Sequence, residues 1–101
     1  MKQDKKDALD LLFAEARKDP EMMRGLEEAH IQADAAGAVF DLRAELGLSI
    51  ESFAQMVNLS PTTVEDIEAA DYDGDLLKAL IEIAVASRRR VSVSLREDTR
   101  I

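Results

Sequence analysis

The residue types that most often carry catalysis are few in this chain, and they lack the partners that catalysis requires. His30 is the only histidine, and no second metal-type ligand lies at a convincing spacing from it, so we expect it on the surface or in helix packing. Ser49 and Ser60 have no histidine within reach of their motifs and are better explained as helix caps than as nucleophiles. The acidic residues lack the context of a glycosidase or a nuclease. We therefore expect neither an enzyme nor a metal or cofactor site.

Arg88, Arg89 and Arg90 form a basic run whose guanidinium groups could bind phosphate. That role requires the run to lie alongside a nucleic acid, which a dimer could bring about. The alternative is a solvated run at the end of a helix, where the helix dipole favours cations. The sequence leaves both interpretations open.

The net charge of −8 is unexpected for a protein that binds nucleic acid, because affinity for phosphate needs basic residues. Residues 44–77 carry eight Asp or Glu and no Lys or Arg, so this segment alone equals the whole negative balance. Residues 78–101 instead carry six basic and three acidic residues. A surface built from residues 44–77 is therefore expected to be acidic.

The elements that would position such side chains centre on residues 48–68. Ser49 can cap a short helix, and Asn58 tolerates the left-handed conformation that ends one. Ser60 can cap a second helix, with Pro61 at the first position, where a missing N–H has no cost. Apolar residues recur at helical spacing in both helices, at Phe53, Ala54, Val57, Val64 and Ile67. Two short helices joined by a sharp turn have the geometry of a DNA-reading motif, whose second helix enters the major groove.

The stretch LRAELGLSIESFAQMVNLSPTTVEDIE resembles the helix-turn-helix of the lambda-repressor and Cro-like proteins, the XRE family. The resemblance covers about Val39 to Ala86. The residues that carry it are Leu42-Arg43, Gly47-Leu48, Ala54, Asn58 in place of the family's glycine, Val64 and Glu68. The expected fold is therefore all-α, a lambda-repressor-like domain.

The resemblance also implies roles for individual residues. The DNA-reading positions of the second helix correspond to Ser60, Pro61, Thr62, Thr63 and Asp66. The threonines could contact phosphates or a thymine methyl, whereas a carboxylate at position 66 could accept from cytosine but would repel phosphate. Ile50 replaces a glutamine that the family uses on DNA, and an exposed isoleucine there would favour a protein interface. In the family, residues matching Arg43 and Glu68 form an ion pair within the domain.

The flanking sequence predicts further elements. We expect one helix from about Gln3 to Lys18 and a long one over Pro20–Leu46, with a break possible at Gly37. Asp19-Pro20 separates them. A turn rich in Asp and Gly precedes a strongly apolar helix that starts at Leu76.

The C-terminal residues Val91, Val93 and Leu95 alternate with serines, which predicts a single β-strand. A lone strand cannot satisfy its own backbone groups, so these three residues are expected to form a dimer interface or to pair with another protein. The predicted organisation is an N-terminal helical extension over 1–34, a helix-turn-helix domain over 35–87, and a strand and tail over 88–101.

The layout of these parts resembles the antitoxin subunits of some type II toxin–antitoxin modules, which bind a toxin and repress their own promoter. The sequence thus predicts a DNA-binding transcriptional regulator, as a homodimer, with double-stranded DNA and a toxin protein as partners. The alternative is a protein-interaction module that has the same fold and has lost DNA binding because its recognition face is acidic.

At 101 residues the chain is expected to form a single domain with a small aliphatic core, since aromatic residues make up only 4%. Dimerisation is a common remedy for the limited stability of a core of this size. The chain has no cysteine, and neither a signal peptide nor a membrane span is readable in it. We therefore expect a soluble, cytoplasmic protein.

Overall fold

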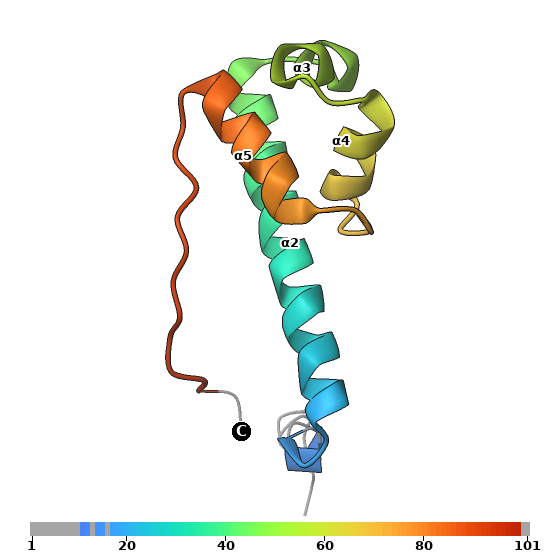
Figure 1. Ribbon diagram of the computed structural model, residues 1–101, viewed down its shortest axis with the longest axis vertical. Coiled ribbons are helices and arrows are strands. Elements are labelled where there is room, and N and C mark those ends of the chain that lie inside the picture. Colours follow the sequence, from blue (N-terminus) through green and yellow to red (C-terminus); the bar gives the residue numbers. More distant parts are fainter. Residues whose placement is uncertain (1–10, 13, 16, 100–101) are drawn as a thin grey trace, which may run out of the picture. The chain divides into compact units, whose positions relative to one another are not determined.

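The computed structural model describes residues 11–12, 14–15 and 17–99. Within these residues the protein is all-α (Figure 1). Its helices are α2 (Pro20–Leu46), α3 (Ile50–Val57), α4 (Pro61–Glu68) and α5 (Leu76–Ser87). Residues 11, 12, 14, 15 and 17 are helical as well, whereas the earlier part of the predicted first helix lies outside the described residues.

The chain divides into two compact units, to both of which α2 contributes. The larger unit runs from Ala29 to Val93 and contains α3, α4 and α5. The smaller unit comprises, among the described residues, those before position 29 and residues 94–99. In the smaller unit the Nη2 atom of Arg17 lies 3.4 Å from the Oδ2 atom of Asp98.

Helix α2 begins and ends where the sequence predicts. The Asp19 carboxylate accepts hydrogen bonds from the backbone N–H groups of Glu21 (3.0 Å) and Met22 (3.4 Å), which satisfies donors at the start of the helix. Gly47 ends the helix with φ +67°, a conformation that glycine adopts without strain. No break occurs at Gly37, so the bounds Pro20–Leu46 are confirmed.

The two short helices have the caps that the sequence predicts. The Ser49 hydroxyl accepts from the N–H of Ser52 at 3.1 Å, and Asn58 ends α3 in the left-handed region with φ +62°. The Ser60 hydroxyl accepts from the N–H of Thr63 at 3.1 Å, with Pro61 as the first residue of α4. Local side-chain chemistry therefore fixes the turn between α3 and α4.

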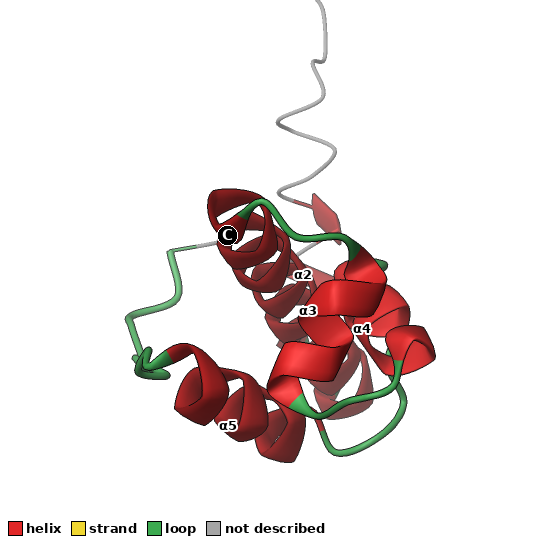
Figure 2. Ribbon diagram, turned by 90° about the horizontal axis from the view of Figure 1, so that it is seen from above, coloured by secondary structure: helices red, strands yellow, loops and turns green. Residues whose placement is uncertain are grey.

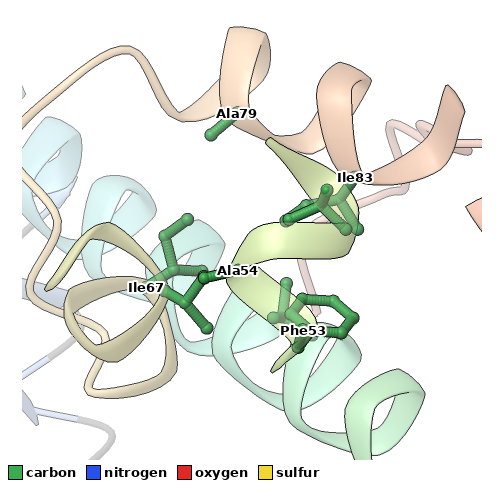
Figure 3. Close-up of a cluster of buried hydrophobic side chains, with 8 residues drawn as sticks. Phe53, Ala54, Ile67, Ala79 and Ile83 are labelled. Atoms are coloured by element: carbon green, nitrogen blue, oxygen red, sulfur yellow. The ribbon is translucent and has the colours of Figure 1, made fainter. Parts of the chain in front are cut away.

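The core of the larger unit lies where α3 meets α4 and α5 (Figure 3). Phe53 and Ala54 of α3, Ile67 of α4, and Ala79 and Ile83 of α5 belong to one cluster of buried side chains, in which Ala54 lies next to Ile67. The other buried members of the cluster are Val39, Val57 and Val64. Phe53 is fully buried, and burying a side chain of this kind contributes about 1.5–3 kcal/mol.

The loop between α4 and α5 is tied to α2 through one glutamine. The side-chain amide of Gln32 donates from Nε2 to the carbonyl oxygen of Tyr72 at 2.7 Å, and its Oε1 atom accepts from the N–H of Tyr72 at 3.4 Å. The Tyr72 side chain is half-buried and packs against the core. Asp75 then caps α5 by accepting from the N–H of Lys78 at 3.0 Å. The start of α5 is thus held to the rest of the unit.

The predicted C-terminal strand is wrong for the structure as described: residues 89–99 have no regular secondary structure. The alternation of Val91, Val93 and Leu95 satisfies the sequence rule for a strand, but none of the described residues offers a strand to pair with. Val93 and Leu95 are 81% and 99% exposed, so they contribute nothing to the core.

Candidate functional site

The exposed surface of α4 follows from the burial of two residues. Val64 and Ile67 are buried in the core, which turns the opposite side of this two-turn helix toward solvent. Pro61, Thr62 and Glu65 are exposed on that side. Thr63 and Asp66 are half-buried at its margin. Four of the five predicted DNA-reading positions, residues 60–63, therefore lie together at the N-terminal end of α4, and Asp66 lies in its second half.

The hydroxyl groups of this surface differ in what they already bind. The Ser60 and Thr63 hydroxyl oxygens lie 2.9 Å apart and share a hydrogen bond, and Ser60 also accepts from the Thr63 N–H. Both hydroxyls thus serve the cap of α4. The Thr62 hydroxyl makes no hydrogen bond with the described residues and is exposed, so it is the hydroxyl best placed to meet an external molecule.

Arg43 and Glu68 form the ion pair that the family resemblance implies. The Nε and Nη2 atoms of Arg43 lie 2.7 and 2.9 Å from the two carboxylate oxygens of Glu68, a two-point contact between α2 and α4. The Nη1 atom donates to the carbonyl oxygen of Leu48 at 2.9 Å. The hydrogen bond to Glu68 raises the pKa of Arg43, burial opposes the rise, and the negative charges of Glu68 and Glu51 add to it. This guanidinium is occupied within the domain.

No basic side chain belongs to α3 or α4, because residues 44–77 contain no Lys or Arg. Glu51 and Glu65 are exposed, and Asp66 is half-buried on the α4 surface. Any phosphate contact made by α3 or α4 themselves must therefore come from hydroxyl, side-chain amide or backbone N–H groups. The acidic surface expected from the composition is present.

The three arginines of the basic run occupy different positions. Arg88 ends α5 in the left-handed region with φ +58°. Arg89 pairs with Glu45 of α2. Arg88 and Arg90 are exposed. In Figures 1 and 2 the C-terminal end of α5 and helix α4 lie on opposite sides of the larger unit. Within one chain, the structure does not bring the predicted arginines and the α4 residues together.

Ile50 differs from what its place in the family pattern suggests. It is half-buried and packs against the core as the first residue of α3. The expectation of an exposed isoleucine available to a protein interface is therefore wrong. An apolar residue at this position is explained by packing against the core.

The exposed apolar residues of α5 are a feature that the sequence reasoning missed. Leu77, Ile81 and Val85 are 58%, 48% and 73% exposed, although they belong to a helix whose other face forms the core. Their spacing of four residues was a readable signal of a second apolar face. The sequence prediction for this segment is a strongly apolar helix that is not divided into two faces.

The remaining predicted residues have no site around them in the described structure. His30 is exposed on α2, with its Nε2 atom 3.3 Å from the Oδ2 atom of Asp34. The described residues contain no group of three or more His, Cys, Asp or Glu arranged to hold a metal ion.

Val91 is half-buried, in contrast to the exposed Val93 and Leu95. Among the described helices none combines the length and the apolar character needed to cross a membrane.

The described residues define a small, all-helical protein whose larger unit presents the short helix α4 at its surface. Comparison of the chain with protein-family models, with curated proteins and with solved structures finds no match. The function must therefore be argued from the residues and their geometry.

Proposed function

We propose that α3 and α4 form a helix-turn-helix of the lambda-repressor type and that the protein is a DNA-binding transcriptional regulator. The arrangement of α3 and α4 carries this proposal. Two eight-residue helices are joined by a three-residue turn, and the buried Val64 and Ile67 leave the first turn of α4 exposed. This is the arrangement in which a second helix can enter the major groove.

The ion pair between Arg43 and Glu68 supports the same proposal. It is the pairing that the family resemblance implies, and it joins α4 to α2 through two hydrogen bonds. A recognition helix must be held rigidly if its side chains are to meet base edges in register. Its own Glu68 provides that attachment here.

Thr62 is the side chain that we assign to the DNA contact. Its hydroxyl can donate to a phosphate, and its methyl group can contact a thymine methyl. The capping hydroxyls of Ser60 and Thr63 lie beside it on the same turn. The N-terminal N–H groups of α4 add donors where the helix dipole favours an anion.

Anisotropy of labelled DNA from upstream of the protein's own gene tests the proposal. We expect sub-micromolar, salt-sensitive binding. Thr62→Glu should weaken it at least tenfold, because it adds a carboxylate at the phosphate contact. Ala86→Glu adds the same charge at an exposed position of α5 and serves as the matched control, with affinity changed less than threefold. Equal loss in both variants would point to net charge and would contradict the assignment of α4.

A second candidate function is favoured by the acidic surface. The helices α3 and α4 carry Glu51, Glu65 and Asp66 and contain no basic residue. Such a surface suits a basic protein partner better than DNA. In an antitoxin, whose layout the chain resembles, that partner would be a toxin. Absence of DNA binding at low salt, with and without a co-expressed partner, would reject the regulator and leave the interaction module.

The variant Glu65→Gln separates the two functions. A regulator should bind DNA more tightly when an exposed carboxylate beside the phosphates is removed. A module that binds a basic protein should lose affinity for that protein. Depending on the function, the same variant thus raises the affinity for DNA or lowers the affinity for a basic protein.

A further inference from the structure

Helix α5 has two apolar faces, and only one of them is used within the chain. Ala79 and Ile83 are buried in the core, and Leu76 and Leu80 are half-buried against it. Leu77, Ile81 and Val85 follow one another at intervals of four residues and are all about half or more exposed. At 100° per residue these three residues lie on the side of the helix away from Ala79 and Ile83. We call this row of three residues the outer stripe.

The outer stripe has the symmetry that a two-fold dimer contact needs. Ile81 lies at its centre, with one large aliphatic side chain four residues before it and another four residues after it. When such a helix packs antiparallel on its own copy, Ile81 meets Ile81, and Leu77 of one chain meets Val85 of the other. A contact of this kind is self-complementary, as an isologous interface must be.

The charges at the two ends of α5 are also self-complementary. The loop before the helix contributes the exposed acidic residues Asp71 and Asp73. The other end carries the exposed Arg88 and Arg90. The helix has 12 residues and is about 18 Å long, so antiparallel packing brings the acidic end of one copy beside the basic end of the other. Parallel packing would place like charges together.

We propose that the protein forms a homodimer in which the outer stripe of α5 packs antiparallel against that of a second copy, with Asp73 of each chain facing Arg88 of the other. Arg89 is already paired with Glu45 in its own chain, and Asp75 caps α5, so neither is needed for the contact. The dimer contact involves none of the proposed DNA-binding residues on α4 and does not depend on DNA binding.

The central contact is tested by the molar mass of the full chain in solution, measured by light scattering over a concentration series. The wild type should be a dimer, and Ile81→Glu should be a monomer at the same concentrations. Ile31→Glu is the matched control, because Ile31 is also an isoleucine with a similar exposed fraction, 54%, and lies on α2. It should remain dimeric, with both variants giving the helical circular dichroism of the wild type.

A charge swap tests the antiparallel orientation. Asp73→Arg alone and Arg88→Asp alone should each raise the dissociation constant of the dimer by about tenfold or more, because like charges then face each other twice. Aspartate is tolerated in the left-handed region that Arg88 occupies. An equimolar mixture of the two variants should recover the wild-type affinity as a heterodimer, because both facing pairs are again of opposite sign.

Three results would overturn the proposal. They are a wild-type monomer at about 100 μM, a concentration at which a dimer with a dissociation constant of about 1 μM would be largely associated, equal dissociation by Ile81→Glu and Ile31→Glu, and a mixture of charge-swapped variants that stays as weak as either variant alone. Recovery of affinity in the mixture cannot arise from a helix that merely unfolds, so the charge swap keeps the test independent of variant stability.

Discussion

Ala70 has a left-handed backbone conformation that is unfavourable for alanine. Each of α2, α3, α4 and α5 is followed within two residues by a residue with positive φ, namely Gly47, Asn58, Ala70 and Arg88. After α4, the N–H of Ala70 bonds the carbonyl oxygen of Ile67 and the N–H of Asp71 bonds that of Asp66, which satisfies two orphan acceptors. The Cβ atom of an alanine is strained at φ +57°, whereas glycine is not.

Ala70→Gly should therefore stabilise the protein. We expect the free energy of unfolding to rise by about 0.5–1 kcal/mol, the left-handed strain outweighing the extra entropy of an unfolded glycine. Urea unfolding followed by circular dichroism measures it. Ala69→Gly is the control one residue earlier, where φ is −87° and no strain exists, so stability should fall. A fall of similar size in both variants would show that Ala70 is not strained.

Some contacts of individual residues could be predicted from the sequence, and others could not. The caps at Ser49 and Ser60 were predicted because residue type and local position determine them. The ion pair between Arg43 and Glu68, which are 25 positions apart, followed only from the family resemblance. The partner of Arg89 was not predicted, because Glu45 lies 44 positions away on another helix. The packing of Ile50 was missed because its neighbours are set by the tertiary fold.

At the scale of elements, the pair of Arg43 and Glu68 attaches α4 to α2. A lysine can replace the charge of Arg43 but not the two parallel hydrogen bonds or the third bond to the Leu48 carbonyl. Because the pKa of Arg43 is raised, the stabilisation from its charge is fully present below the pKa of the unfolded arginine and is lost only in strong alkali. Substitution, rather than titration of the arginine, is the practical test.

Arg43→Lys should lower the melting temperature measurably and loosen α4. Arg24→Lys changes the same residue type in an exposed pair, with Glu21 at 2.7 Å, and should leave the melting temperature nearly unchanged. Hydrogen exchange of the α4 amides should become faster in Arg43→Lys only. A melting temperature equally insensitive to both substitutions would mean that α4 is held by the core alone.

The helices themselves were largely predictable, because their boundaries depend on local signals. The bounds of α2 and the caps of α3 and α4 all follow from Asp, Ser, Asn, Gly and Pro at particular places. The predicted strand failed for the opposite reason. Alternation at Val91, Val93 and Leu95 describes a chain that could enter a sheet, but only a partner strand decides whether it does.

At the scale of the whole molecule, the separation of charge along the chain has a physical use in the proposed dimer. If the α5 helices of two chains packed in parallel, the acidic segment 44–77 would face the acidic segment of the second chain, and the basic run would face the other basic run. In the antiparallel dimer the acidic segment of each chain faces the basic run of the other. The self-association should therefore weaken as salt is raised, since exposed pairs are screened over about 8 Å at physiological ionic strength. The outer stripe should preserve part of the affinity between the two chains at high salt, because apolar contacts are not screened.

Two exposed valines distinguish the proposed α5 interface from the strand interface that the sequence predicted. Val85 lies on the outer stripe and is 73% exposed, and Val93 lies in the terminal segment and is 81% exposed. We expect Val85→Glu to raise the dissociation constant of the dimer by about tenfold or more, because it buries a carboxylate against the Leu77 of the second copy. We expect Val93→Glu to leave it unchanged, since nothing in the described structure covers that side chain. Sedimentation of the two variants under identical conditions makes the comparison, and the opposite ranking would assign the interface to paired terminal strands.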